Sequence, residues 1–112
     1  MKKFIVIYRA TKSAMEKMEK MKNLNPEEMK KTMEPWMVWA KNCGDGLVDI
    51  GTPLGNGHKV SSDGTSQNLW GIVGYSVLQA KNIENALKML KEHPYLTFGD
   101  GCEIEVYESM PH

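Results

Sequence analysis

The segment KKFIVIYR, residues 2 to 9, is apolar on both faces of the strand that it predicts. β-Branched and aromatic residues favour extended structure, and here they occupy residues 4 to 8 without interruption. They divide into two sets, Phe4, Val6 and Tyr8 on one face and Ile5 and Ile7 on the other. A strand of this kind has to be covered on both sides. Any fold for this chain must therefore supply two covering layers.

Two helical stretches follow this strand. The first begins at about Ser13, and the second begins at Pro26, with Asn25 as its N-cap and Glu28 closing a capping box. Pro35 is expected to kink or split the second helix, because proline removes a backbone hydrogen-bond donor. Steps of three and four residues predict its buried stripe, which is Met29, Met33, Trp36, Met37 and Ala40.

The remainder of the chain predicts three strands and one helix. The strands are residues 47–54, 69–80 and 101–109, and the helix is residues 82–93 with Asn82 as its cap. Residues 55–68, GNGHKVSSDGTSQN, are rich in glycine and polar residues and predict a long loop.

The predicted order is strand, helix, strand, strand, helix, strand, within one domain that spans residues 1–112. This order predicts the α+β class and a ferredoxin-like βαββαβ sheet with both helices on one face. Because the first and third strands are apolar on both faces, the other face also needs a cover. A second copy of the chain is the simplest cover, since two-fold homodimers are the commonest oligomers. We therefore expect a homodimer whose two sheets pack face to face as a dimeric α+β barrel.

Composition argues against several classes of partner. Lys and Arg together number 14, as do Asp and Glu, so there is no excess basic charge for nucleic acid. No segment reaches the roughly 18 apolar residues of a membrane span, and the run from Phe4 to Tyr8 is too short for a secretion signal. Cys43 and Cys102 form no CxxC pair and have no histidine at metal-ligand spacing. We expect a cytoplasmic protein with reduced thiols, no metal and no cofactor.

Several segments together resemble a known family. LWGIVGYSVLQAKNIENALKMLKEHPYL and GCEIEVYESMP resemble the YCII-related family, including its DGPF branch. CGDGLVDIGTPLG is similar to the second strand of that family, and HKVSSDG to the turn before the third. The resemblance covers residues 43–111 well and the first 42 residues loosely. It implies a dimeric α+β barrel, in agreement with the order of the predicted elements.

This chain departs from the family pattern at two places. TSQNLW stands where the DGPF motif would fall. The suspected acid–base pair of the YCII type is a histidine on the first helix and an aspartate before the helix-ending proline. Here His93 occupies the aspartate position, and the first helical region contains no histidine. The pair therefore does not carry over to this chain.

His93 is the first candidate for chemistry. It lies directly before Pro94 at the end of a helix, and proline forces the preceding residue away from helical angles. A histidine there can transfer protons, because its ordinary pKa lies near neutrality. Equally, it can end the helix, where a cation suits the dipole and the ring satisfies carbonyl groups.

Two charged residues are candidates for orienting a ligand. Asp49 interrupts an apolar run and, if buried, would need a partner. Arg9 is the only arginine and suits bidentate capture of a carboxylate, either that of a ligand or that of Asp49. The alternative for Arg9 is a surface ion pair. Glu103 and Glu105 share one face of the last strand and could form an acidic pair whose members shift each other's pKa, or they are exposed charges that protect an edge strand from aggregation.

Tyr8, Trp36 and Trp39 are candidates for the wall of an apolar ligand cavity between helix and sheet. Aromatic residues at this spacing also serve as ordinary core. We expect the chain to bind a small organic molecule in such a cavity. Cofactor-independent acid–base chemistry there would use His93 with Asp49 or Arg9. The alternative is a non-catalytic dimeric regulatory or interaction module, and a cofactor-independent oxygenase is a third reading that no residue demands.

Overall fold

The computed structural model describes residues 1–20, 23–68 and 71–111. Its strands (β), α-helices (α) and 3-10 helices (η) are, in chain order, β1 (Lys2–Ala10), α1 (Lys12–Lys20), α2 (Pro26–Cys43), η2 (Gly44–Gly46), β2 (Leu47–Asp49), β3 (His58–Ser61), β4 (Gly64–Gln67), β5 (Gly71–Ala80), α3 (Ile83–Lys91), η3 (Pro94–Thr97) and β6 (Cys102–Glu108). Leu69 and Trp70, the predicted start of the third strand, lie outside the described residues.

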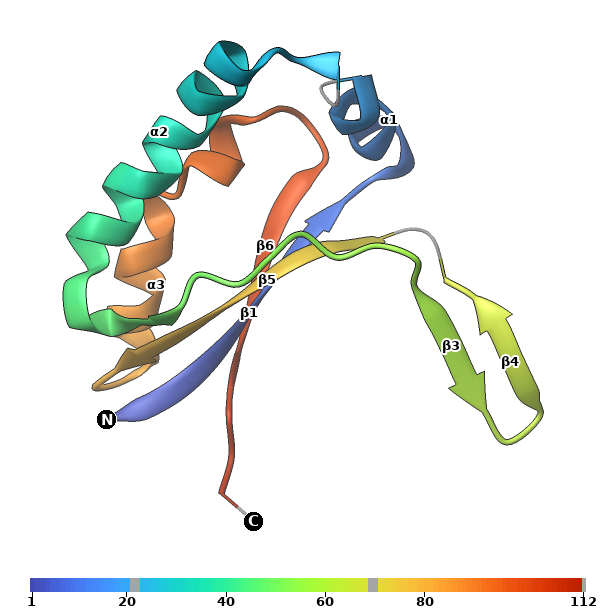
Figure 1. Cartoon of the computed structure of the whole chain (residues 1–112). Helices are drawn as coiled ribbons and strands as arrows, with labels where there is room; N and C mark the ends of the chain where they lie inside the picture. The colour runs from blue at the N-terminus through green and yellow to red at the C-terminus, as the bar shows by residue number, and fades with distance from the viewer. Residues whose placement is uncertain (21–22, 69–70, 112) are drawn as a thin grey trace.

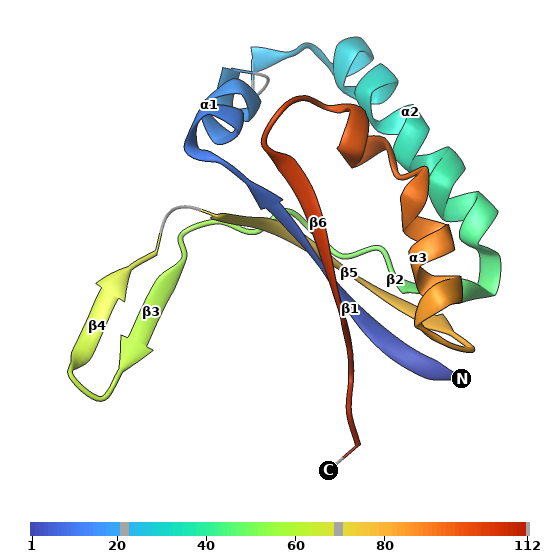
Figure 2. The same cartoon turned by 180° about the vertical axis from the view of Figure 1, so that it is seen from behind.

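Four strands form an antiparallel sheet in the order β2-β5-β1-β6. The chain crosses from β1 to β2 through α1 and α2, and from β5 to β6 through α3. Helices α2 and α3 lie on the same side of the sheet in both views (Figures 1 and 2). The predicted α+β class is confirmed.

The helix-covered face of the sheet forms the core. On β1, Phe4 and Val6 are completely buried and Tyr8 is 3% exposed. Phe4 lies opposite Leu78 of β5, and Val6 lies opposite Val106 of β6, so the three long strands contribute to one apolar layer. The alternation predicted for β1 therefore determines which side chains face the helices.

Helix α2 begins as predicted. The side chain of Asn25 accepts a hydrogen bond from the Glu28 amide and donates one to the Glu28 carboxylate. Of the kink or split predicted at Pro35, the split does not occur, because α2 runs from Pro26 to Cys43 as one helix with Pro35 inside it. A proline ring removes only one of the helix hydrogen bonds, and the packing of the following turns holds the helix together.

The buried side of α2 differs from the predicted stripe. Trp39 is buried, and Met37 is 60% exposed. The helix packs through a neighbouring stripe that also has steps of three and four, namely Trp36, Trp39, Ala40 and Cys43. A spacing pattern counts methionine and tryptophan alike as apolar residues, so it does not distinguish the two stripes. Which stripe is buried depends on which one faces the sheet and α3.

The loop predicted for residues 55–68 is wrong. These residues contain a hairpin in which β3 pairs with β4 in a separate two-stranded sheet. The turn follows Ser61, and Gly64 has a φ of +132° that favours glycine. Asp63-Gly64 between short segments that contain Val60 and Thr65 is a hairpin signal that the glycine-rich flanks obscured.

The second predicted strand, residues 47–54, is shorter in the structure. β2 ends at Asp49, and Gly51 takes a φ of +78°, which interrupts the extended backbone. The chain rejoins β5 at Pro53, which forms an isolated bridge with Gly74. Within the described residues, no helix is both long enough and apolar enough to cross a membrane.

Candidate functional site

The site is centred on His93, which follows α3 in extended conformation before Pro94. Its backbone angles are those that a residue before proline prefers. The ring turns inward, and the residue is only 1% exposed. His93 Nδ1 accepts a hydrogen bond of 3.0 Å from the Tyr95 amide, and this bond caps η3. The prediction that His93 stands at a helix end is confirmed, but its side chain is in the core.

A chain of buried hydrogen bonds starts at this ring. His93 Nε2 lies 3.0 Å from the Tyr8 hydroxyl, which lies 2.7 Å from the Ser76 hydroxyl. Ser76 donates to the backbone carbonyl of Ile50 at 2.6 Å. We call His93, Tyr8 and Ser76, with the Tyr95 amide and the Ile50 carbonyl, the relay.

The two ends of the relay determine the direction of every bond in it. The Tyr95 amide can only donate, so Nδ1 of His93 is the acceptor and a neutral ring carries its proton on Nε2. Nε2 then donates to Tyr8, Tyr8 donates to Ser76, and Ser76 donates to Ile50. Among the described residues, no buried side-chain nitrogen or oxygen lacks a hydrogen-bond partner.

Burial keeps the relay neutral. Desolvation lowers the pKa of His93 from 6.5 to about 4, because the charged imidazolium is disfavoured in a dry interior. Desolvation also raises the pKa of Tyr8 to about 12, against the opposing effect of its hydrogen bond to Ser76. Burial raises the pKa of Tyr95 as well. At neutral pH His93 is therefore an uncharged hydrogen-bond donor.

Aromatic rings enclose His93. The ring centroids of Trp39, Trp36 and Tyr8 lie 4.2, 4.5 and 5.1 Å from that of His93. Trp39 Nε1 donates to the Met89 carbonyl at 2.8 Å, which holds α2 against α3. Four of the residues chosen from the sequence, His93, Tyr8, Trp36 and Trp39, are thus brought together.

Asp49 and Arg9 have other partners. The carboxylate of Asp49 is exposed and accepts the Gly51 amide at 2.8 Å, which closes a local turn. Arg9 forms a partly exposed ion pair with Glu105, at 3.6 Å between Nη1 and Oε1. Since the register alternates, the Arg9 side chain is on the opposite face of β1 from Tyr8. The surface pair considered for Arg9 is the arrangement in the structure.

Sequence reasoning missed Ser76 and the part played by Tyr95. Ser76 is the hydroxyl residue within the apolar run of β5, on the same face as Leu78, and it is completely buried. A serine at a core-facing position of a central strand implies a buried hydrogen-bond partner. That signal was available, but the identity of the partners depends on β1 and α3 meeting there.

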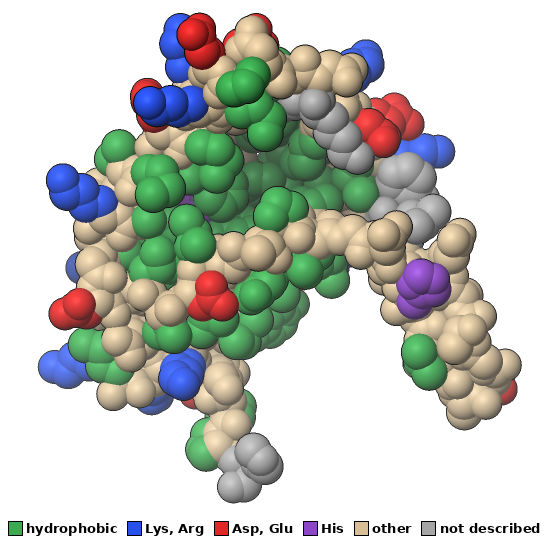
Figure 3. Space-filling model, viewed as in Figure 1, with side chains coloured by type: hydrophobic (Ala, Val, Ile, Leu, Met, Phe, Trp, Pro, Cys, Tyr) green, Lys and Arg blue, Asp and Glu red, His purple; other side chains and the backbone are tan. Residues whose placement is uncertain are grey.

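A cavity of about 380 Å³ lies next to the relay. It is bounded by β1, α1, α2, β5, the chain after β2, and the region of η3. Most of its lining residues are apolar or aromatic, and they include Tyr8, Met18, Met33, Trp36, Tyr95 and Phe98. Figure 3 shows a hollow lined by hydrophobic side chains between α1, α2 and the chain that follows β2. Tyr8 belongs both to the relay and to this lining.

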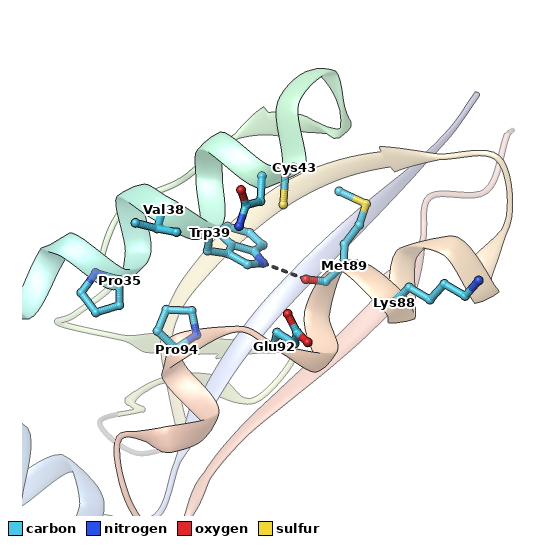
Figure 4. Close-up of a pocket in the computed structure, with 9 residues that line it drawn as sticks. Pro35, Val38, Trp39, Cys43, Lys88, Met89, Glu92 and Pro94 are labelled. Carbon is cyan, nitrogen blue, oxygen red and sulfur yellow. Dashed lines mark hydrogen bonds between the residues drawn. The ribbon is translucent and has the colours of Figure 1, made fainter.

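A second hollow, of about 550 Å³, lies between α2 and α3. Pro35, Trp39 and Pro94 contribute apolar surface, and Lys88 and Glu92 contribute charge (Figure 4). Cys43 also lines it, and burial raises the pKa of this thiol, which disfavours the reactive thiolate.

In the part of the chain that the structure describes, neither hollow contains a cluster of three metal-binding side chains. Among the described residues, no three His, Cys, Asp or Glu side chains are placed to bind a metal ion. Comparison of the chain with known proteins gave no match to a family model and no match to a curated protein.

Proposed function

We propose that this chain binds a small, largely apolar organic molecule in the 380 Å³ cavity beside the relay. The observation that carries the proposal is an apolar cavity in whose lining the hydroxyl groups of Tyr8 and Tyr95 are already hydrogen-bonded. The cavity therefore offers hydrophobic contact without an unsatisfied buried group. Binding sites for small molecules commonly have volumes of about 300–1,000 Å³ and walls that are mostly apolar.

The lining restricts the class of ligand. The rings of Trp36, Tyr95 and Phe98 favour a flat or aromatic molecule, because aromatic pairs gain energy beyond their buried area. Thr32 and Thr52 add hydroxyl groups that could orient one polar substituent. Among the described residues, those that line the cavity include no Lys, Arg, Asp or Glu, so the charge of a strongly charged ligand would be poorly compensated.

In this proposal His93 positions Tyr8 rather than transferring a proton. A general base needs an unprotonated nitrogen within reach of the substrate. In the relay, Nδ1 accepts the Tyr95 amide and Nε2 donates to Tyr8, so neither nitrogen is free for that purpose. Binding is therefore favoured over acid–base catalysis, and Asp49 and Arg9 have no assigned part in it.

A second candidate is a non-catalytic dimeric regulatory or interaction module. The open face of the sheet favours it, because Ile5, Ile7 and Val77 there are only partly buried in one copy. We propose that two copies pair through this face as a dimeric α+β barrel. The strand order β2-β5-β1-β6 supports a ferredoxin-like βαββαβ sheet, and the relationship to the YCII-related family rests on the sequence motifs.

The binding proposal is tested by titration with 1-aminoanthracene, a flat apolar fluorophore. We expect saturable fluorescence enhancement and a rise in melting temperature. At a ligand concentration of 100 times the dissociation constant, binding should raise the free energy of unfolding by about 2.7 kcal/mol. This corresponds to a rise in melting temperature of roughly 10 °C for a domain of this size. Thr32→Trp, which places a large side chain at the cavity, should abolish the binding.

Met37→Trp is the matched control. Met37 is on the same helix and is 60% exposed, and it is not among the residues that line the cavity. Binding that is unchanged in Thr32→Trp, or lost equally in both variants, would refute the assignment to this cavity. An absence of saturable binding by this probe and by a panel of small aromatic molecules would refute the function.

A further inference from the structure

The hairpin of β3 and β4 projects from the rest of the molecule. We call residues 57–68 the arm. All eight strand residues of the arm are exposed, and Val60 is 77% exposed. Figures 1 and 2 show the arm extending to the side of the four-stranded sheet that α2 and α3 leave uncovered.

An arm of this size needs a surface to pack on. A two-stranded hairpin by itself is marginally stable at best in water. Its register places Val60 opposite Thr65 and His58 opposite Gln67 on one face. The other face carries Lys59 opposite Ser66, so the apolar contribution is on the Val60 face. This face is the one that gains from being covered.

The root of the arm gives it a defined direction. The Leu54 amide donates to the Val73 carbonyl at 2.9 Å, and the Asn68 amide donates to the Gly57 carbonyl at 2.7 Å. A side chain at Gly57 would collide with the backbone of Asn68, so the two legs of the arm approach closely there. The first hydrogen bond joins the chain just before the arm to β5, and the second joins the two legs of the arm to each other.

The open face next to the arm is apolar along its centre. Ile5 lies opposite Val77 of β5 and opposite Tyr107 of β6, and Ile7 lies opposite Tyr75. Tyr107 is 55% exposed. The arm and this face are on the same side of the sheet, so a body that packs on the face comes next to the arm (Figures 1 and 2).

We propose that the arm clasps a second copy of this chain seated on the open face, through the side that carries Val60 and Thr65. The inference rests on the homodimer in the proposed function and adds a contact that the sheet does not make. In a two-fold dimer each arm holds the other copy, so the contact occurs twice.

The flat outline of the open face indicates how much further contact a second copy seated on it would need. The three long strands have 7 to 10 residues each, so at about 4.8 Å between strands and 3.3 Å per residue they cover roughly 400 Å². A stable interface buries about 800 Å² on each partner. The sheet by itself falls short of that area, and an arm that reaches around the partner adds to it.

The test measures the dimer dissociation constant by analytical ultracentrifugation in three variants. We expect Val60→Glu to weaken the dimer at least tenfold, because it places a charge in the clasped face. Ser66→Glu, on the opposite face of the same arm, should leave the constant within twofold. Val77→Glu, on the open face, should give a monomer at micromolar concentration. Circular dichroism checks that each variant is folded, and Val60 is too exposed in one copy for its substitution to unfold the chain.

Hydrogen exchange of the arm separates failure of the clasp from failure of the dimer. We expect the amides of β3 and β4 to gain protection as protein concentration rises through the dissociation constant. A dimer that survives Val60→Glu with unprotected arm amides overturns the clasp and leaves the homodimer standing. A monomer at all concentrations overturns both. Protection independent of concentration, or equal weakening by Val60→Glu and Ser66→Glu, also overturns the clasp.

Discussion

The two faces of β1 lie on one strand but have different surroundings. Phe4 and Val6 are completely buried under the helices, and Ile5 and Ile7, their direct neighbours, are only partly buried. Both sets are apolar, so both gain free energy from removal from water. In a single copy of the chain, the helices therefore bury the apolar side chains on one face of β1 completely, while those on the other face keep part of their surface in water.

The largest test of this comparison is an alanine substitution on each face. Phe4→Ala should lower the free energy of unfolding by about 3–5 kcal/mol, because it leaves a cavity in the closed core. Ile5→Ala should cost about 1 kcal/mol in the monomer, since its side chain is already partly in water. Urea unfolding at a protein concentration at which ultracentrifugation finds a monomer measures both. Equal losses would show that the faces do not differ in a single copy.

The pH dependence of stability is a second test, directed at the relay on the covered face. Because burial lowers the pKa of His93 to about 4, the unfolded chain binds its proton first as pH falls. Stability from this source is complete above pH 6.5 and is lost progressively down to about pH 4, by at most about 3 kcal/mol.

The carboxylates also titrate in acid, so the comparison uses the difference between wild type and His93→Gln. We expect the wild type to lose more stability between pH 6.5 and pH 4 than the variant does, as measured by urea unfolding at each pH. His58→Gln, in the exposed arm, should follow the wild type. Identical curves for wild type and His93→Gln would mean that His93 is protonated as readily in the fold as in the unfolded chain.

The smallest effect is expected from removing one hydroxyl. Tyr8→Phe leaves His93 Nε2–H without its acceptor and should lower the free energy of unfolding by about 1–3 kcal/mol. Tyr107→Phe, on the open face, should change the free energy of unfolding by less than about 0.5 kcal/mol, because its side chain is 55% exposed. A loss of similar size in both variants would remove the distinction between the relay and the open face.

Local signals predicted much of the fold. The cap at Asn25, the strand at residues 2–9 and the end of α3 before Pro94 depend on neighbours within a few residues, and the structure has each of them. The hairpin at residues 55–68 was missed because glycines on both sides weakened a short strand signal. The stripe of α2 was misassigned because two adjacent stripes had the same spacing.

The sequence named four residues that the structure brings together and two that it does not. The sequence indicated His93, Tyr8, Trp36 and Trp39 as separate candidates with plausible chemistry. Asp49 was a candidate for orienting a ligand, but its carboxylate accepts the Gly51 amide in a local turn. Gly51 also has a positive φ there, which no residue pattern specified.

By itself, the sequence determined the α+β class, the apolar character of both faces of β1 and the placement of His93 at a helix end. These follow from periodicity and from the steric rules around proline, which act over a few residues. The tertiary structure alone decided that His93 faces inward, that Tyr8 and Ser76 complete its hydrogen bonds, and that a cavity adjoins them. The hydrogen bonds from His93 through Tyr8 and Ser76 to Ile50 join residues 26 to 85 positions apart in the chain, and only the packing of strands and helices brings such residues within about 3 Å.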